Sequence, residues 1–367
     1  MTAIRFSFYL AIILTHQLAV VSSAQQRLDP KLQVQVDRTV KSEMESQNLV
    51  GVAIGIIQKG QVVYTQGYGL ANREKKTKFT AKTITNWASN SKPIVGVRAM
   101  QLVEQGKLKL EDRIRKYLPE LPKHCDAITV RHLLCHQSGY PHYSNGRILK
   151  LAKPIASDRG AEDPVFSINR FGGSPLLRDP GLAYSYSSYA FVILSAVLQR
   201  ADGQPLPQQI AAGISKPLGM SSFGLDEKYE GQKYWSVGYK RNVFGKVAEV
   251  PHYAHDWKHG AGAYKSNVID FANWAAALIN GKLVTKKSET LMWTPQKLAS
   301  GKGTNVGLGF FVETQNNTLK VYHGGSHSEA RSRMVLYPRE RHGIVVLSNC
   351  GHAEPSKIST AIYRALK

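Results

Sequence analysis

The chain has 367 residues, of which 43% are hydrophobic, and its 48 lysines and arginines outnumber its 26 acidic residues, giving a formal net charge of +22. This composition is typical of a globular protein with one large domain or two closely packed ones. The basic residues are dispersed and no nucleic-acid-binding module is present, so we expect no nucleic-acid partner. A basic protein of this kind can instead be attracted to anionic polymers or carboxylate substrates.

The first 24 residues differ from the rest of the chain. Arg5 gives a basic start, residues 6–21 are largely apolar, and residues 22–24 are small, as a cleavage site requires. Polar residues at 15–17 interrupt the apolar stretch, which argues against an uncleaved membrane anchor. We therefore expect a signal peptide, a mature domain in residues 25–367, a secreted or periplasmic location, and no stable membrane insertion after cleavage.

The mature chain begins with a charged segment at about 30–47 that predicts a helix. Residues 50–58 and 61–69 are rich in β-branched and aromatic side chains, and Lys59 and Gly60 lie between them. Two such segments separated by a short glycine-containing turn predict a β-hairpin.

A helix is predicted next, and Pro93 fixes its start. Proline is tolerated only in the first turn, so the helix must begin close to Ser89, and Gly106 ends it. Residues three apart on a helix share a face, so the amine of Lys92 can approach the hydroxyl of Ser89. A serine hydroxyl becomes a good nucleophile when a nearby base takes its proton. Ser-x-x-Lys also occurs as an ordinary helix cap, so the pair needs partners elsewhere in the chain.

The middle of the chain is mainly helical, with predicted helices at 128–139, 191–198 and 268–278. Thr129 is the expected N-cap of the first of these. The end of the chain returns to strands, followed by one closing helix. The strands are expected at 309–312, 320–325, 333–337 and 343–348, and the helix at 356–366.

This order predicts an α/β (α+β) fold. An antiparallel sheet flanked by helices is built from both ends of the chain, at about 48–88 and 300–350, and a mainly helical subdomain is inserted at about 106–285.

Three cysteines, Cys125, Cys135 and Cys350, cannot all pair within one chain. Cys125 and Cys135 can form a disulfide in an oxidising compartment, and buried free thiols are the alternative.

A separate candidate site is His252-x-x-His255-x-x-x-His259, with Asp256 nearby. Imidazoles at such spacing are able to bind zinc. Proline, tyrosine and tryptophan around them favour a surface loop instead, so we predict no metal and no cofactor.

Three motifs occur in order: Ser89-x-x-Lys92, Tyr186-Ser187-Ser188 and His323-Gly324-Gly325. With them the chain resembles the serine β-lactamase and penicillin-binding family, and most closely its class C branch, which includes D-alanyl-D-alanine carboxypeptidases and related esterases. The segments 128–139 and 345–349 also match this family. The resemblance covers about residues 32–367 and implies a β-lactamase/transpeptidase-like fold.

The resemblance implies a role for each motif residue. Ser89 is expected to attack a carbonyl and become acylated, and Lys92 to help relay its proton. Tyr186 is the expected general base, with a pKa lowered by a cationic lysine beside it. The oxyanion is expected to bind the backbone N–H groups of Ser89 and Ser326.

Substrate is expected to lie along His323 and Gly325, whose motif leaves space beside the backbone, and to contact Ser188. Two residues depart from the family pattern. Ser188 stands where the family has asparagine, and a serine has a shorter reach and fewer hydrogen-bonding atoms. His323 replaces the lysine of class C β-lactamases, so a positive charge there depends on pH. Both changes favour esters over β-lactams.

The sequence therefore predicts a secreted serine hydrolase that forms an acyl-enzyme on Ser89. Its substrate is a small molecule or peptide: a D-Ala-D-Ala-type peptide, a β-lactam or a small ester. One alternative is a penicillin-binding-like protein that is acylated without efficient turnover. A metal-dependent hydrolase is a third interpretation. The oligomeric state is not predicted.

Overall fold

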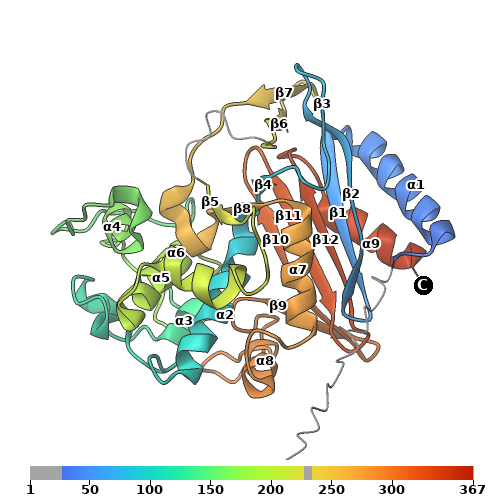
Figure 1. Cartoon of the computed structure of the whole chain (residues 1–367). Helices are drawn as coiled ribbons and strands as arrows, with labels where there is room; N and C mark the ends of the chain where they lie inside the picture. The colour runs from blue at the N-terminus through green and yellow to red at the C-terminus, as the bar shows by residue number, and fades with distance from the viewer. Residues whose placement is uncertain (1–26, 227–233, 367) are drawn as a thin grey trace, which may run out of the picture.

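The computed structural model describes residues 27–226 and 234–366, so the predicted signal peptide lies outside the described residues. Their main feature is a seven-stranded antiparallel sheet in the order β3-β2-β1-β12-β11-β10-β9 (Figure 1). No helix in these two ranges combines the length and the apolar character needed to cross a membrane. The strands of the sheet are β1 (Gly51–Gln58), β2 (Gln61–Asn72), β3 (Thr77–Lys78), β9 (Phe311–Gln315), β10 (Thr318–Ser326), β11 (Arg331–Tyr337) and β12 (His342–Ser348).

The sheet joins the two ends of the chain, as predicted. β1 pairs antiparallel with β12, with Ile54 opposite Val346. β1 and β2 form the predicted hairpin, and both residues of its turn, Lys59 (φ 51°) and Gly60 (φ 77°), have positive φ. This left-handed pair matches the twist of the flanking strands and so fixes their register.

β1 is buried on both faces of the sheet. Val52, Ile54 and Ile56 belong to a core under α1 (Pro30–Gln47) and α9 (Pro355–Ala365). The alternate residues Ala53 and Ile57 belong to a larger core on the opposite face. Because successive strand side chains point to opposite faces, one apolar strand holds two layers of helices together.

On this second face, α7 (Val268–Ile279) packs directly against the sheet. A Cβ atom at Gly55 would lie 2.8 Å from the Cβ of Ala272, so glycine is needed for this close approach. The predicted helical insertion, 106–285, is therefore too long, because α7 lies within it by sequence but belongs to the layers of the sheet.

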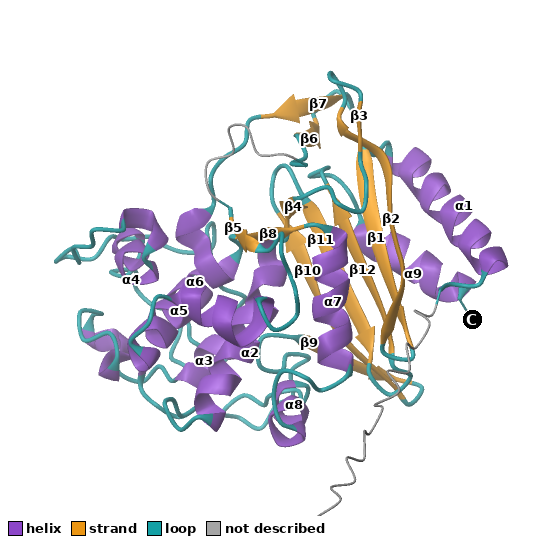
Figure 2. Cartoon of the chain, viewed as in Figure 1, coloured by secondary structure: helices purple, strands orange, loops and turns teal. Residues whose placement is uncertain are grey.

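The remaining helices gather beside the sheet as a separate helical region (Figure 2). Their bounds are α2 (Ser91–Glu104), α3 (Val130–Leu134), α4 (Pro164–Ser167), α5 (Ser188–Asp202), α6 (Leu206–Ile210) and α8 (Lys286–Met292). Thr129 caps α3, as predicted, although this helix ends before the expected stop at 138–139. Two small sheets were not predicted: β4 (Thr85–Asn86), β8 (Tyr264–Ser266) and β5 (Gly224–Leu225) form one, and β6 (Gly238–Arg241) and β7 (Val247–Val250) the other.

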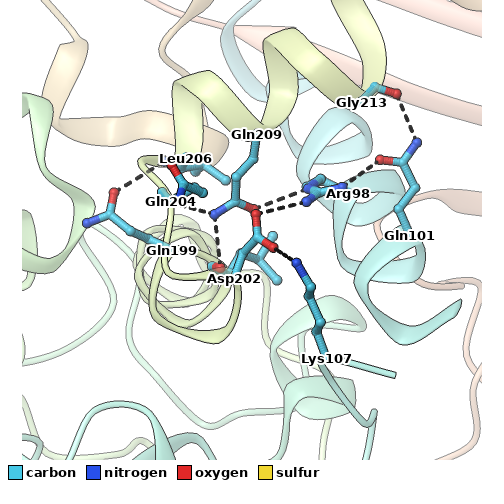
Figure 3. A network of polar contacts seen from close by, with 10 residues as sticks. Arg98, Gln101, Lys107, Gln199, Asp202, Gln204, Leu206, Gln209 and Gly213 are labelled. Atoms are coloured by element: carbon cyan, nitrogen blue, oxygen red, sulfur yellow. Dashed lines mark hydrogen bonds and ion pairs between the residues drawn. The ribbon is translucent and has the colours of Figure 1, made fainter. Parts of the chain in front are cut away.

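A buried polar network ties α2 to α5 and α6 (Figure 3). Arg98 of α2 forms an ion pair with Asp202 at the end of α5, at 3.1 Å, and its Nε donates to Gln209 of α6, also at 3.1 Å. Lys107 forms a second ion pair with Asp202, at 2.5 Å. α2 and α5 carry two of the predicted motifs at their N-terminal ends, and this network helps to hold the two helices together farther along their length.

All three cysteines are buried free thiols. Of the two alternatives for Cys125 and Cys135, the structure therefore has the unpaired thiols. Burial raises the pKa of Cys125 to about 11 and that of Cys135 to about 12, so both are protonated and poorly reactive at neutral pH.

Candidate active site

Ser89 lies in a short 3₁₀ turn, η1 (Ala88–Asn90), directly before α2. The α-helix itself begins at Ser91, close to the predicted start. Ala88 has φ +48°, a left-handed conformation that costs a non-glycine residue about 1–3 kcal/mol. Its N–H donates to the side-chain oxygen of Asn86, at 2.5 Å, which helps to hold this conformation. The chain thus bends sharply just before Ser89.

Lys92 is completely buried and its nitrogen has three oxygen neighbours. Nζ lies 3.1 Å from Ser89 Oγ, 3.2 Å from Ser188 Oγ and 2.6 Å from the carbonyl oxygen of Ala261. Burial holds the pKa of Lys92 well below its ordinary value, and the positive charge of Lys258 lowers it further. The lysine is thus disposed to be a neutral amine, with a lone pair that can take a proton.

Tyr186 lies beside this pair, with the centre of its ring 4.9 Å from Lys92 Nζ. Burial raises the pKa of Tyr186 above its ordinary value, although a hydrogen bond with Ser89 opposes this shift. The predicted lowering of this pKa is therefore wrong. The prediction assumed a cationic lysine, whereas Lys92 is itself buried and its pKa is lowered, so it does not favour a phenolate.

Two histidines hold the segment that contains Tyr186. Ser187 is the N-cap of α5, and its hydroxyl accepts from the backbone N–H of Ala190 at 3.1 Å. The Nδ1 of His136 accepts from the backbone N–H of Ser187, at 3.2 Å, and the ring of His136 packs 4.3 Å from that of Tyr186. The Nδ1 of His142 accepts from the backbone N–H of Ser188, also at 3.2 Å.

Neither histidine is among the site residues predicted from the sequence. His136 lies within the family-like segment 128–139, which was the one available signal. His142 has no motif of its own, because only the fold brings it to the start of α5. Burial lowers the pKa of His142 to about 4, so it is neutral and free to accept at neutral pH.

The predicted edge strand, β10, closes the other side of the site. A Cβ atom at Gly325 would lie 2.1 Å from both the carbonyl oxygen of Trp87 and the Oγ of Ser332. The Ser332 hydroxyl donates to that Trp87 carbonyl, at 2.5 Å. Glycine is therefore needed for β10 to pack against the turn that carries Ser89.

His323 is neutral in this environment. Burial, and then the neighbouring Lys92, lower the pKa of His323 to about 3. Its Nδ1 lies 2.7 Å from the carbonyl oxygen of Gly324, which can only accept, so Nδ1 carries the proton. The family lysine supplies a positive charge at this position, and His323 supplies none at neutral pH.

A cavity of about 710 Å³ opens above these groups. Its lining brings together six of the seven predicted site residues, Ser89, Tyr186, Ser188, His323, Gly325 and Ser326. Lys92, the seventh, is buried beneath the floor. The hydroxyl of Ser89 thus faces the cavity, whereas the amine of Lys92 is shielded from it.

The cavity is also lined by two arginines of β11 that the sequence argument missed. Arg331 donates to the Ser326 hydroxyl and, at 2.6 Å, to the carbonyl oxygen of His327. The guanidinium of Arg333 lies 4.3 Å from the centre of the Tyr322 ring. Arginines recognise carboxylates in a bidentate manner, so this wall of the cavity fits an anionic group.

The three histidines of the candidate zinc site each contact a different partner. His255 Nε2 contacts Glu329 Oε1 at 2.7 Å, His252 Nε2 lies 3.3 Å from Asp226 Oδ1, and His259 Nε2 lies 3.0 Å from the carbonyl oxygen of Ala161. Across residues 27–226 and 234–366, no group of three or more histidines, cysteines or acidic residues is arranged to hold a metal ion.

Known proteins with similar sequences include a relative named as a penicillin-binding protein. PbpX of Bacillus subtilis (strain 168), which carries the name of a penicillin-binding protein, is 32% identical over 259 residues, which make up 70% of this chain and 61% of PbpX. Protein flp of Staphylococcus aureus (strain N315) is 25% identical over 88% of this chain and 64% of its own length. The chain thus spans somewhat less than two thirds of these curated relatives.

Solved structures share the fold. The octameric penicillin-binding protein homologue from Pyrococcus abyssi superposes with a TM-score of 0.76 and 25% identity, over 91% of this chain and 77% of that one. The D-amino acid amidase from Ochrobactrum anthropi SV3 has a TM-score of 0.76 and 19% identity, over 92% and 99% of the two chains.

The β-lactamase family model matches residues 36–367, which is nearly all of the described chain. The predicted fold, an antiparallel sheet flanked by helices, is confirmed by these structural neighbours. The chain belongs to the β-lactamase family, within the superfamily of serine β-lactamases and penicillin-binding proteins.

Proposed function

We propose that the protein is a serine hydrolase that cleaves an ester or amide through an acyl-enzyme on Ser89. One observation carries this proposal: a fully buried lysine amine lies 3.1 Å from the Ser89 hydroxyl. Burial lowers the pKa of this amine and so favours its neutral form, which can act as a base, and a serine needs such a base to become a nucleophile.

The hydrogen bonds of Lys92 orient this base. The Ala261 carbonyl can only accept, so it takes one N–H of the neutral amine. A second N–H points to Ser188 Oγ, which leaves the lone pair for the Ser89 proton. Ala261 ends η7 (Asp256–Ala261), and Gly260 of this turn donates to Ser195 of α5 at 3.2 Å, so the acceptor is fixed in place.

In the acylation step, Ser89 Oγ bonds to the substrate carbonyl carbon as its proton passes to Lys92. The oxyanion is stabilised by backbone N–H groups of Ser89 and Ser326. The bond to the leaving group breaks as that group takes a proton from the Tyr186 hydroxyl, and Lys92 returns its proton to Tyr186. In deacylation, a water molecule gives one proton to the Lys92–Tyr186 pair as its oxygen attacks the acyl carbon. The bond between this carbon and Ser89 Oγ then breaks, Oγ takes a proton back from the pair, and the acid is released.

The cavity supports a substrate that carries a carboxylate. Arg331 and Arg333 line the wall next to Ser326, and Glu354 is the one acidic residue among the residues lining the cavity. We infer a small carboxylate-bearing ester, or a peptide of the D-Ala-D-Ala type, as the preferred substrate. β-Lactams are expected to be poorer substrates, because Ser188 and neutral His323 replace the asparagine and lysine. Secretion remains part of the proposal, because it depends on the signal-like residues 1–24.

A serine-reactive fluorophosphonate tests the nucleophile. The protein is expected to gain one mass increment, located by peptide mapping to Ser89, and Ser89→Ala should abolish it. Ser91→Ala is the matched control, because the Ser91 hydroxyl accepts from the backbone N–H of Tyr264 at 3.0 Å and lies outside the cavity lining. Labelling that persists in Ser89→Ala would disprove the assignment.

Hydrolysis assays then distinguish an enzyme from a protein that is acylated without turnover. The substrates are a chromogenic cephalosporin, a D-alanyl-D-alanine peptide and short nitrophenyl esters. Steady turnover of an ester or peptide is the expected result. A single burst of product equal to the amount of protein, with no turnover after it, would instead assign a penicillin-binding-like protein that is acylated but not regenerated.

A further inference from the structure

The turn between β6 and β7 presents two large apolar side chains to solvent. Val243 is 93% exposed and Phe244 is 91% exposed, whereas the other exposed large apolar side chains of the described residues reach 60% at most. The turn is ordered by its own hydrogen bonds: the side-chain oxygen of Asn242 accepts from the backbone N–H groups of Phe244 and Lys246, both at 3.0 Å. The two apolar side chains are thus held outward by the local structure.

The hairpin is firmly attached to the body of the protein. Tyr239 of β6 is buried, and its backbone exchanges hydrogen bonds with Asn349 (2.8 Å) and Gly351 (2.7 Å), just after β12. Its phenol oxygen accepts from the backbone N–H of Arg73 at 2.7 Å. The hairpin is therefore held in a fixed position next to the central sheet.

Basic residues lie on the same hairpin as the apolar pair and on the hairpin next to it. Lys240 and Lys246 flank it on the hairpin, and the β2–β3 turn lies alongside, because Arg73 donates to the carbonyl oxygen of Val247 at 3.1 Å (Figure 1). We call the following exposed residues the tip surface: Arg73, Lys75, Lys76, Lys78, Lys240, Val243, Phe244 and Lys246.

The positive charge of the tip surface is not neutralised within the described chain. None of its lysines, nor Arg73, takes part in an ion pair between residues of 27–226 and 234–366. The tip surface has six basic side chains, and Glu74 and Glu249 are the acidic residues in the same two hairpins.

We propose that the tip surface docks the protein on an anionic lipid membrane. Exposed aromatic and aliphatic side chains enter the boundary between headgroups and acyl chains, and lysines and arginines around them bind the anionic headgroups. A soluble polyanion would be bound by the cations alone and would leave Val243 and Phe244 in water. The combination of an exposed apolar pair with neighbouring basic residues therefore favours a lipid surface as the partner.

Docking of this kind is peripheral and separate from catalysis. No tip-surface residue lines the cavity above Ser89, so the proposal does not depend on the hydrolase activity. Variants of the tip surface are expected to bind lipid less well and to hydrolyse a soluble ester as before.

Vesicle flotation tests the proposal, with phosphatidylcholine alone or mixed with phosphatidylglycerol. The full chain should bind the mixed vesicles and not the neutral ones, and added salt should weaken binding. Val243→Ser with Phe244→Ser should lower the affinity about 100-fold or more. Lys75→Gln, Lys76→Gln and Lys246→Gln together should lower it about 100-fold, since each cation near the surface contributes roughly a factor of five.

Matched control variants show whether binding depends on the tip surface or only on the overall positive charge of the chain. Val34→Ser removes another exposed apolar side chain, on α1. Lys282→Gln, Lys287→Gln and Lys302→Gln remove three exposed lysines far from the hairpin in sequence. Both controls should bind the mixed vesicles within about twofold of the parent, and thermal unfolding should show that every variant is folded.

Phe244→Trp gives a direct readout, because tryptophan emission shifts to shorter wavelength when the ring leaves water. The shift should appear with mixed vesicles and be absent with soluble polyglutamate. Equal loss of binding in the control lysine variant, no loss in the Val243/Phe244 variant, or no emission shift would each overturn the proposal.

Discussion

The amine nitrogen of Lys92 lies 2.6 Å from the carbonyl oxygen of Ala261, a residue that follows it by more than 160 positions in the chain. This carbonyl offers no proton, so the hydrogen bond fixes the direction of one N–H and, with Ser188 holding a second, aims the remaining nitrogen orbital at Ser89. In the proposed mechanism the base and nucleophile are therefore aligned before substrate binds, which would lower the cost of reaching the transition state.

Lys92 and Tyr186 should behave as one proton-handling unit. Lys92→Met or Tyr186→Phe should each lower kcat/KM for a nitrophenyl ester by about 10² to 10⁴, the usual contribution of general acid–base catalysis. The double variant should be little worse than the poorer single variant, because groups that act together are not additive. Losses that multiply in the double variant would show that the two groups act independently.

The activity should fall as the pH falls, because protonation of Lys92 removes the base. The pKa of Lys92 is held low first by burial and then by the charge of Lys258, whose own pKa is lowered to about 8 by burial. Lys258→Met removes that charge at neutral pH, so the pKa of Lys92 rises and the acid limb of kcat/KM moves to higher pH. Lys282→Met, an exposed control, should leave the limb where it is, and an unshifted limb in Lys258→Met would contradict this account.

Ser188 and His323, which replace the family asparagine and lysine, should determine the preference for esters over β-lactams. Ser188→Asn with His323→Lys should shift the ratio of kcat/KM values toward a cephalosporin, because the longer amide and a fixed charge favour an anionic lactam. The parent activity should also show no titration near pH 6.5 from His323, since the pKa of this histidine is about 3. A parent that turns over cephalosporins at about 10⁶ M⁻¹s⁻¹ and ignores esters would refute the argument.

Arg331 and Arg333 should govern the recognition of charged substrates. Arg331→Gln with Arg333→Gln should lower kcat/KM for a nitrophenyl ester that bears a carboxylate by about 10- to 100-fold, the worth of a charge-assisted hydrogen bond. A neutral nitrophenyl acetate should change by less than about threefold, and the exposed control Arg364→Gln should change neither. Equal losses on both esters would mean that the arginines only support the fold.

The network around Asp202 should matter for stability. The side chains of Asp202 and Arg98 are each 7% exposed, so Asp202→Ala leaves a buried guanidinium without its acid and should lower the free energy of unfolding by about 3–5 kcal/mol. Glu111→Ala breaks the Arg131–Glu111 pair, in which Glu111 is 68% exposed, and should cost less than about 1 kcal/mol. Urea denaturation measures the free energy of unfolding of both variants. Equal losses would contradict the argument that burial makes the Asp202 ion pair more important for stability.

Several features follow from the sequence alone because they depend on neighbours along the chain. Pro93 places the start of a helix near Ser89, Thr129 caps α3, and Lys59-Gly60 makes a two-residue hairpin turn. Apolar runs at both ends of the chain are sufficient to predict a shared sheet. The order of the three motifs then identifies the family, because each motif is a few residues long and can be read locally.

Other features are decided by contacts between distant segments. The lowered pKa of Lys92 and the raised pKa of Tyr186 come from burial, which no short stretch of sequence reports, and this is why the predicted lowering of the Tyr186 pKa was wrong. Likewise, Arg331 and Arg333 enter the cavity only because β11 pairs with β10 beside the turn of Ser89. The sequence alone determined which groups can react, and the tertiary structure decided their protonation and surroundings, because desolvation and charge depend on what the folded chain packs around each atom.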